Sequence, residues 1–125
     1  LNDAHGHLIG DDVLRAVVGV LNDTLRAEDV LARYGGEEFA VLVRGANKDG
    51  ARVLAERLRK EIGELALTKE GGGERLAVTV SIGISNFPLP NPADVPSEQM
   101  GQRLIELADA ALYRAKNAGR NRVEG

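Results

Sequence analysis

The stretch Arg33-Tyr34-Gly35-Gly36-Glu37-Glu38-Phe39 joins two short apolar runs, residues 30–32 and 39–43. Two such runs joined by Gly-Gly predict a β-hairpin, because glycine reaches the positive φ values that tight hairpin turns require. Glu37 and Glu38 follow the glycines directly, at the tip of the hairpin. A turn of bare backbone lets a phosphate group approach, and a neighbouring carboxylate can hold a divalent cation against it. The stretch therefore predicts a hairpin with a phosphate and metal site at its tip; a solvated turn carboxylate is the alternative.

The composition is typical of a single soluble globular domain. The chain has 125 residues, of which 43% are hydrophobic and 28% charged, enough for one hydrophobic core. A formal net charge of −3, with two Phe, two Tyr and no Trp, argues against binding to nucleic acid or to an anionic membrane surface. The absence of cysteine excludes disulfides and thiolate metal sites. No apolar run approaches the roughly 20 residues of a membrane span, so we expect no membrane contact by this domain.

Apolar residues at helical spacing predict three helices. The first begins near Asp11 or Asp12, either of which can cap free backbone N–H groups. The second covers about residues 49–67 and the third about residues 98–117, where Gly119 follows in the position typical of a helix end. Helices therefore stand on both sides of the hairpin along the chain.

Two further segments have strand patterns. Strict alternation over residues 76–85 predicts a long strand, with one apolar face and one face of small residues against which a helix can pack closely. The run 39–43 is apolar almost throughout, which predicts a central strand covered on both faces. Gly71-Gly72-Gly73 marks a loop, and residues 121–124 can add a short edge strand.

The predicted order of elements is helix, two strands, helix, strand, helix, strand. This order is most of a ferredoxin-like βαββαβ unit. We therefore predict an α/β (α+β) fold with a central, mainly antiparallel sheet and flanking helices. The strand that should precede the first helix is missing, and the chain opens without Met inside a polar turn. We expect that strand to lie upstream of Leu1 in a longer protein.

Further motifs lie on both sides of the hairpin stretch. The chain opens with Asn2-Asp3, Gly6-His7 and Gly10-Asp11, and it closes with Ala111-Leu112-Tyr113-x-Ala115-Lys116 and then Gly119-Arg120-Asn121. With Gly-Gly-Glu-Glu-Phe between them, these motifs make the chain resemble the GGDEF family, the diguanylate cyclases, along essentially its whole length. The resemblance implies one GGDEF domain over residues 1–125, with the catalytic fold of the nucleotidyl cyclases and without its first strand.

The resemblance also implies an activity. GGDEF enzymes condense two GTP molecules into cyclic di-GMP and release two pyrophosphates, each 3′-hydroxyl attacking the α-phosphate of the other nucleotide. Such a reaction needs positioning and neutralisation of charge, here by Mg²⁺ or Mn²⁺. One domain would bind one GTP, so catalysis implies a two-fold homodimer. An upstream sensor or dimerisation domain and a cytoplasmic location, alone or as the cytoplasmic part of a larger protein, are implied as well.

In the hairpin stretch, the resemblance implies substrate contacts at Gly35 and Gly36. It also implies metal ligation by Glu37, which would activate the attacking hydroxyl, and support of metal and substrate by Glu38. The family takes a second metal carboxylate from the strand before Asn2, which this chain does not contain. We therefore expect little or no turnover from these 125 residues alone.

Asn2, His7 and Asp11 are the next candidates. An amide and a carboxylate together can satisfy the mixed donor and acceptor edge of guanine, and the resemblance implies that Asn2 and Asp11 bind it. Spacing alone favours the alternative, in which Asn2 is a turn residue and Asp11 caps the first helix. His7 would lie near the substrate, although a single histidine in a turn is more often structural.

Lys116 and Arg120 are four residues apart, which predicts that they share a helix face near its C-terminus. The resemblance implies that they bind the triphosphate. Arg120 is suited to two parallel hydrogen bonds to a phosphate group, and Lys116 provides a compact positive charge. A favourable interaction with the helix dipole is the alternative.

Arg26 and Asp29 form an Arg-x-x-Asp sequence at the predicted end of the first helix, just upstream of the hairpin. The resemblance implies an inhibitory site that binds the product, cyclic di-GMP, with Arg57 as a second arginine. A surface ion pair is the alternative. A receptor that binds cyclic di-GMP without turnover is a second hypothesis for the whole domain; the intact pair Glu37-Glu38 favours the enzyme.

Overall fold

The structure, a computed structural model, describes residues 11–35, 38–68, 75–87 and 95–125. Its elements are α1 (Asp11–Thr24), β1 (Val30–Gly35), β2 (Glu38–Leu42), α2 (Lys48–Gly63), β3 (Leu67–Thr68), β4 (Arg75–Leu76), β5 (Ile82–Gly83), the 3₁₀ turn η2 (Ser97–Gln99), α3 (Met100–Asn117) and β6 (Val123–Glu124). The strands form three two-stranded sheets: β1–β2 and β3–β4 are antiparallel and β5–β6 is parallel. The predicted mixed α/β fold is confirmed. No helix in these ranges is both long and apolar enough to cross a bilayer.

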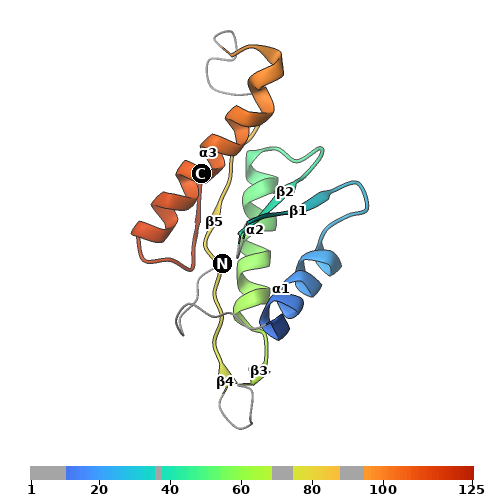
Figure 1. Cartoon of the computed structure of the whole chain (residues 1–125), viewed down its shortest axis with the longest axis vertical. Coiled ribbons are helices and arrows are strands. Elements are labelled where there is room, and N and C mark those ends of the chain that lie inside the picture. The colour runs from blue at the N-terminus through green and yellow to red at the C-terminus, as the bar shows by residue number, and fades with distance from the viewer. Residues whose placement is uncertain (1–10, 36–37, 69–74, 88–94) are drawn as a thin grey trace.

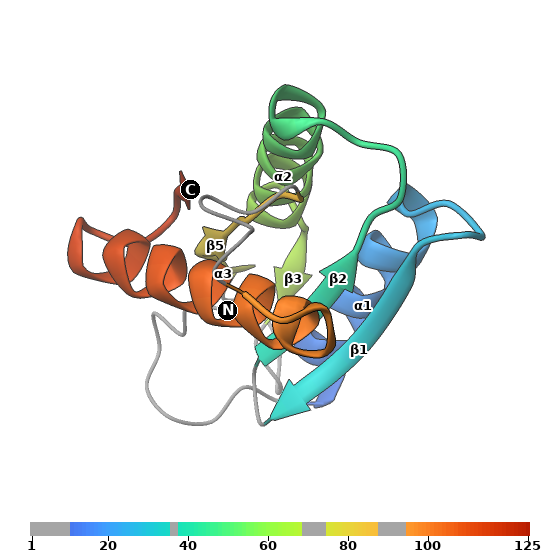
Figure 2. The ribbon, with the colours of Figure 1, turned by 90° about the horizontal axis from the view of Figure 1, so that it is seen from above.

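In space, α2 lies between two groups of elements. Figure 1 shows α3 on one side of it and α1 with the β1–β2 hairpin on the other. Figure 2 shows the same division from above. The hairpin and the last helix, which carry most of the described candidate residues, therefore lie on different sides of α2, and they approach each other at the hairpin tip.

The core lies between α1, α2 and the extended chain that leads to β5. Its buried residues are Val13, Val17 and Leu21 from α1, Leu58 and Ile62 from α2, and Val78 and Val80 from the extended chain. On the helices these positions recur every four residues, which confirms the predicted helical spacing because such residues share one helix face. Burying one such side chain is worth about 1.5–3 kcal/mol, so this cluster holds the two helices together.

The end of α2 differs from the prediction. The helix begins after Asn47, whose side-chain Oδ1 accepts a hydrogen bond from the Gly50 N–H at 2.7 Å. It ends at Gly63 rather than near residue 67. Leu65 still packs against the core from beyond the helix. The spacing of apolar residues therefore continues to Leu65, although the backbone there is no longer helical. The short β3–β4 hairpin that follows was not predicted, and its glycine loop, 71–73, lies outside the described residues.

The predicted long strand over residues 76–85 is wrong in its extent. This range contains only the end of β4 and then β5, with an isolated bridge at Thr79 between them. An alternating pattern records which side chains face the core, and Val78 and Val80 are indeed buried. A strand also needs a ladder of hydrogen bonds to a neighbour, and the ladder with β6 covers only Ile82–Gly83.

The small-residue face of this segment packs against α3, as predicted. Gly83 lies so close to the helix that a Cβ atom there would overlap the backbone of Ala108 and Leu112. The Ser85 hydroxyl donates a hydrogen bond to the Leu104 carbonyl at 2.6 Å. The helix therefore sits directly on the extended chain, without the separation that larger side chains would impose.

β1 and β2 form the predicted hairpin, but β2 is not a central strand. The register pairs Val30 with Leu42 and Gly35 with Glu38, and it shifts between Arg33 and Gly35. Within the described residues β2 pairs only with β1, and Leu42 is 54% exposed. A continuous apolar run shows that a strand can be covered on both faces, but it does not supply the neighbours that would cover it.

The end of α3 follows the prediction from Gly119, which adopts a φ of 119°. The Arg120 N–H donates to the Ala115 carbonyl at 3.0 Å, and the Gly119 N–H donates to the Lys116 carbonyl at 3.4 Å. This pair of bonds is the Schellman motif, which ends helices at a left-handed glycine. The chain then enters β6, so the short strand predicted over residues 121–124 forms at Val123–Glu124 only.

Candidate functional site

The hairpin tip and the end of α3 come together in the structure. Lys116, in the last turn of α3, has its Nζ 3.8 Å from Oε1 of Glu38, the first residue of β2. The two side chains are 34% and 47% exposed, and an ion pair this open contributes at most about 1 kcal/mol. The two groups are therefore close neighbours that an entering ligand can separate.

Local structure explains both positions. Glu38 stands opposite Gly35 in the hairpin register, directly after the turn. Lys116 follows Ala115, which is fully buried, so Lys116 leaves the helix at the margin of its packed face. The hairpin turn and the packing of α3 thus bring a carboxylate and an ammonium group together from distant parts of the chain.

Arg120 does not share a helix face with Lys116, contrary to the prediction. α3 ends at Asn117, and Arg120 lies beyond it with a φ of 62°. The four-residue spacing places side chains together only within a helix, and Gly119 has already turned the chain. The direction of the Arg120 side chain is therefore set by this turn.

Four predicted site residues lie outside the described residues: Asn2, His7, Gly36 and Glu37. Guanine binding by Asn2, substrate contact by His7 and Gly36, and metal ligation by Glu37 remain predictions. Asp11 is described, and it is an exposed residue at the start of α1. A carboxylate there interacts favourably with the positive end of the helix dipole, so both interpretations of Asp11 stand.

Of the residues proposed to hold a metal, the structure describes Glu38. No three His, Cys, Asp or Glu side chains cluster within residues 11–35, 38–68, 75–87 and 95–125. Mg²⁺ is commonly bound by one or two carboxylates together with substrate phosphates. The half-exposed carboxylate of Glu38 is a donor of this kind, so its chemistry fits a supporting role.

The Arg26–Asp29 sequence forms the turn between α1 and β1, beyond the helix end rather than on it. The Arg26 N–H donates to Asp29 Oδ2 at 2.9 Å, and the Asp29 N–H donates to the Arg26 carbonyl at 3.0 Å. The Arg26 guanidinium approaches Glu28 at 4.0 Å and is 76% exposed. Asp29 Oδ1 is buried and has no hydrogen-bond partner among the described residues. Buried side-chain oxygens are usually hydrogen-bonded, so this unpaired acceptor is unusual.

Arg57 is bound by a carboxylate that the sequence reasoning did not single out. Its Nε lies 2.9 Å from Glu61 Oε1, and the Thr24 hydroxyl donates to Glu61 Oε2 at 2.9 Å. The hydrogen bonds from Arg57 and Thr24 lower the pKa of Glu61 below its ordinary value of 4.5. Thr24 is the last residue of α1, so Glu61 ties α2, with Arg57, to the chain just before Arg26. Arg57 and Glu61 are four residues apart, a spacing from which the pair could have been predicted. No pattern in the sequence indicates that Thr24 would bond Glu61.

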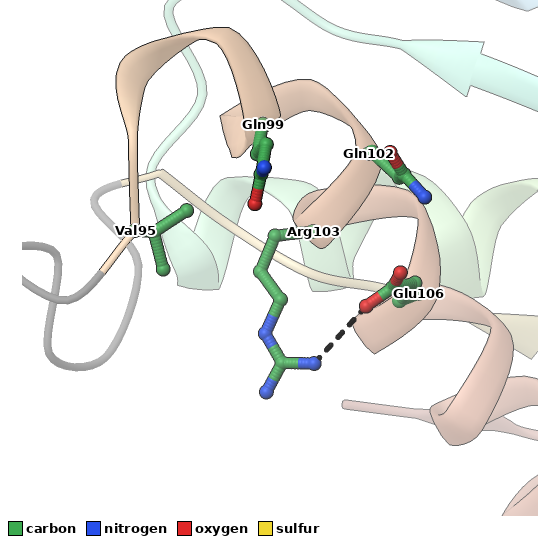
Figure 3. Close-up of a pocket in the computed structure, with 5 residues that line it drawn as sticks. All are labelled: Val95, Gln99, Gln102, Arg103 and Glu106. Carbon is green, nitrogen blue, oxygen red and sulfur yellow. Dashed lines mark hydrogen bonds and ion pairs between the residues drawn. The ribbon is translucent and has the colours of Figure 1, made fainter.

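A separate hollow lies at the other end of α3 (Figure 3). Its volume is about 250 Å³, and its lining residues are Val95, Gln99, Gln102, Arg103 and Glu106. Arg103 forms an ion pair with Glu106 at 3.2 Å, drawn as the dashed line. Gln102 and Lys116 are separated by about 21 Å along the helix axis at 1.5 Å per residue, so this hollow is not part of the site at the hairpin tip.

Known proteins similar to this chain identify its family. The family model "Diguanylate cyclase, GGDEF domain" matches residues 1–122. The chain is 44% identical over 124 residues to Diguanylate cyclase DgcP of Pseudomonas aeruginosa, and 39% identical over 123 residues to Diguanylate cyclase A of Treponema denticola. These alignments cover 99% and 98% of this chain but only 17% and 31% of the relatives. The chain therefore corresponds to one part of each of those proteins.

Solved structures share the fold. The crystal structure of the GGDEF domain of DgcB from Caulobacter crescentus in complex with c-di-GMP matches with a TM-score of 0.77 at 35% identity, over 98% of this chain and 68% of that one. The active GGEEF domain of a diguanylate cyclase from Vibrio cholerae matches with a TM-score of 0.65 at 25% identity, over 98% and 72%. From the family match along nearly its whole length and the shared fold, the chain belongs to the GGDEF family of diguanylate cyclase domains.

Proposed function

We propose that this chain is the catalytic domain of a diguanylate cyclase, which condenses two GTP molecules into cyclic di-GMP and two pyrophosphates. The observation that carries the proposal is the approach of Lys116 to Glu38 at 3.8 Å. It places a cation suited to phosphate beside a carboxylate suited to a metal ion, next to a glycine turn. The family and the likeness to proteins named diguanylate cyclase support the same reaction.

The phosphate end of GTP would lie between the hairpin and the end of α3. Gly35 and Gly36 keep side chains out of the space that the phosphates need. Lys116 and Arg120 supply positive charge. When GTP binds, the Lys116 ammonium exchanges its weak contact with Glu38 for a phosphate oxygen, because a charge-assisted bond to phosphate is the stronger of the two.

Glu37 and Glu38 are the residues that would hold Mg²⁺ or Mn²⁺ at the hairpin tip. A bound divalent cation would neutralise charge that develops on the α-phosphate. Glu37 also accepts the proton of the 3′-hydroxyl that attacks the α-phosphate of the second nucleotide. The new P–O bond forms as the bond to pyrophosphate breaks, so no covalent enzyme intermediate is needed.

The base end of GTP is assigned to Asn2 and Asp11, whose amide and carboxylate complement the donor and acceptor edge of guanine. His7 would stand beside the substrate. Each domain holds one GTP, so two copies related by a two-fold axis must bring their sites face to face. We place the domain in the cytoplasm, under the control of an upstream sensor or dimerisation domain.

Control by the product is assigned to Arg26, Asp29 and Arg57. Asp29 supplies a carboxylate, a group that accepts hydrogen bonds from the N–H donors of guanine, and its Oδ1 has no partner among the described residues. The exposed Arg26 guanidinium suits a phosphate. Glu61 and Thr24 hold Arg57 close to the same end of α1. The structure of the related DgcB domain in complex with c-di-GMP supports the ligand class.

Analysis of reaction products tests the proposal. The full-length protein is incubated with Mg²⁺ and either GTP or ATP, and the nucleotides are separated by chromatography. We expect cyclic di-GMP from GTP and no cyclic product from ATP. Binding of cyclic di-GMP without any turnover of GTP would overturn the proposal of an enzyme and favour the hypothesis of a cyclic di-GMP receptor.

A further inference from the structure

The turn that follows α3 has an unusual backbone. Gly119, Arg120 and Asn121 have φ values of 119°, 62° and 48°. Within the described residues, Arg120 and Asn121 are the only non-glycine residues with a positive φ. Such residues are disfavoured sterically and persist only where their surroundings hold them. Glycine adopts this region freely and asparagine tolerates it better than most residues, but neither preference explains why two further residues follow Gly119 into it.

A side chain from α2 reaches this turn. Arg59 Nη1 donates to Asn121 Oδ1 at 2.9 Å, while Arg59 Nε donates to Glu56 Oε2 at 2.9 Å. The guanidinium is thus fixed by two bonds at once, and the Arg59 side chain is only 28% exposed. The guanidinium is planar and its donors have fixed directions. The bond to Glu56 therefore determines the direction in which Arg59 Nη1 donates to Asn121.

Other contacts hold the chain on either side of Asn121. Arg122 Nε donates to the Arg120 carbonyl at 3.3 Å. Further along, Arg52 of α2 donates to the carbonyls of Gly125 at 2.7 Å and Val123 at 3.5 Å. The last residues therefore run along α2, and Arg59 is the side chain of α2 that bonds the left-handed turn itself.

We propose that Arg59, oriented by Glu56, is a positioning residue that holds the turn 119–121 through Asn121 and so directs Arg120 to the triphosphate of GTP. This inference rests on the proposed function, because it assigns Arg120 to the nucleotide. Arg120 has a long side chain, and on a loose turn its guanidinium would occupy many positions before binding. A fixed backbone restricts those positions in advance and reduces the entropy that binding must remove.

The first test measures nucleotide affinity in Arg59 variants of the full-length protein. The probe is 3′-deoxy-GTP with Mg²⁺, which lacks the attacking hydroxyl, and its Kd is measured by titration calorimetry. Arg59→Ala should raise the Kd about tenfold, the equivalent of one unsupported left-handed residue. Arg59→Lys keeps the charge but cannot bond Glu56 and Asn121 with the same geometry, so it should bind as weakly as Arg59→Ala. Wild-type affinity in Arg59→Lys would overturn the proposal in favour of a simple charge effect.

Arg103 provides the matched control. It also pairs with a carboxylate three residues away, Glu106, but at the N-terminal end of α3. Arg103→Ala should bind 3′-deoxy-GTP with the wild-type Kd. A rise in Kd equal to that of Arg59→Ala would overturn the assignment, because loss of any helix-surface arginine would then have the same effect.

The second test uses two substitutions of Asn121 and stays decisive if Arg59→Ala fails to fold. Asn121→Ala removes the bond to Arg59 and keeps a side chain that disfavours the left-handed region. Asn121→Gly removes the same bond but adopts that region freely. We expect weaker binding in Asn121→Ala and recovery of most of the affinity in Asn121→Gly. Equal losses in both, or no loss in either, would overturn the proposal.

Arg120→Ala separates the two levels of inference. It should raise the Kd of 3′-deoxy-GTP about ten- to a hundredfold, because a charged hydrogen-bonding partner is lost. If Arg120→Ala binds normally, the assignment of Arg120 to the triphosphate fails and the positioning role falls with it. If Arg120→Ala binds weakly while Arg59→Ala and Asn121→Ala bind normally, only the positioning role is wrong.

Discussion

The hairpin tip and the end of α1 hold their charged groups in opposite ways. At the tip, Lys116 and Glu38 stand 3.8 Å apart in a half-exposed contact. At the end of α1, Glu61 accepts two hydrogen bonds of 2.9 Å, from Arg57 and Thr24. Short bonds fix side chains before a ligand arrives, whereas an open contact leaves them free to exchange partners. For the proposed assignments, this difference implies a substrate site whose groups rearrange during the reaction and a product site that is assembled in advance.

The largest expected effect lies at the hairpin tip. Glu37→Ala removes the carboxylate proposed to hold the metal and to accept the hydroxyl proton, so GTP turnover should fall about 10²–10⁴-fold. Chromatography of the nucleotide products measures the loss, with Glu98→Ala in η2 as the control for an exposed carboxylate elsewhere. If Glu37→Ala forms as much product as the wild type, Glu37 has neither of these roles. The contrast between a reactive site at the hairpin tip and a product site at α1 would then have no support.

The second prediction concerns the exchange of partners by Lys116. Lys116→Ala should raise the KM for GTP, since a charge-assisted bond is worth about 1.5–3 kcal/mol, or roughly ten- to a hundredfold in affinity. Steady-state kinetics measure it. Lys60 is a matched control, because it also lies in the last turn of a helix. If Lys60→Ala and Lys116→Ala raise KM equally, Lys116 serves only the helix dipole.

The third prediction tests the product site that we propose at Arg26. Arg26→Ala should weaken cyclic di-GMP binding by about ten- to a hundredfold, for the same reason, and should relieve product inhibition while the KM for GTP stays unchanged. Titration calorimetry compares it with Arg15→Ala, an exposed arginine on α1. Equal affinities in the two variants would make Arg26 an ordinary surface residue.

The smallest effect is a pH dependence of stability at the same site. Hydrogen bonds lower the pKa of Glu61 in the folded state below its ordinary value of 4.5. The ionised carboxylate therefore stabilises the folded state at pH values above that ordinary pKa. That contribution is lost as the pH falls through the folded pKa. Melting curves of the wild type and Glu61→Gln should therefore differ at neutral pH and converge in acid, with Glu64→Gln as the control. A difference that is independent of pH would mean that Glu61 acts through packing.

Features that depend on local spacing were predictable from the sequence. The stripe Val13, Val17 and Leu21 is buried, and Gly119 ends α3. The errors arose where distant residues decide the outcome. α2 stops early at the start of a hairpin between β3 and β4, and the strand at β5 is only as long as its ladder with β6.

The candidate site shows the same division. Lys116 and Glu38 were both candidates, but their contact depends on how α3 packs, which no spacing reports. For Arg120, two local rules conflicted, since the four-residue spacing assumed a helix that Gly119 was already predicted to end. The helix stop prevailed because a left-handed residue breaks the backbone geometry on which the spacing depends. Thr24 was missed because a hydroxyl at a helix end can bond many neighbours.

The contact at Gly83 bears on the reach of Lys116. α3 rests on this glycine so closely that no side-chain atom fits between them. An added methyl group would lift the helix, and overpacking of this kind costs about 1–3 kcal/mol. Lys116 travels with α3, so the same displacement would alter its separation from Glu38 on the hairpin. The absence of a side chain at Gly83 therefore helps to set the distance between the two groups that we propose to meet the phosphates and the metal ion.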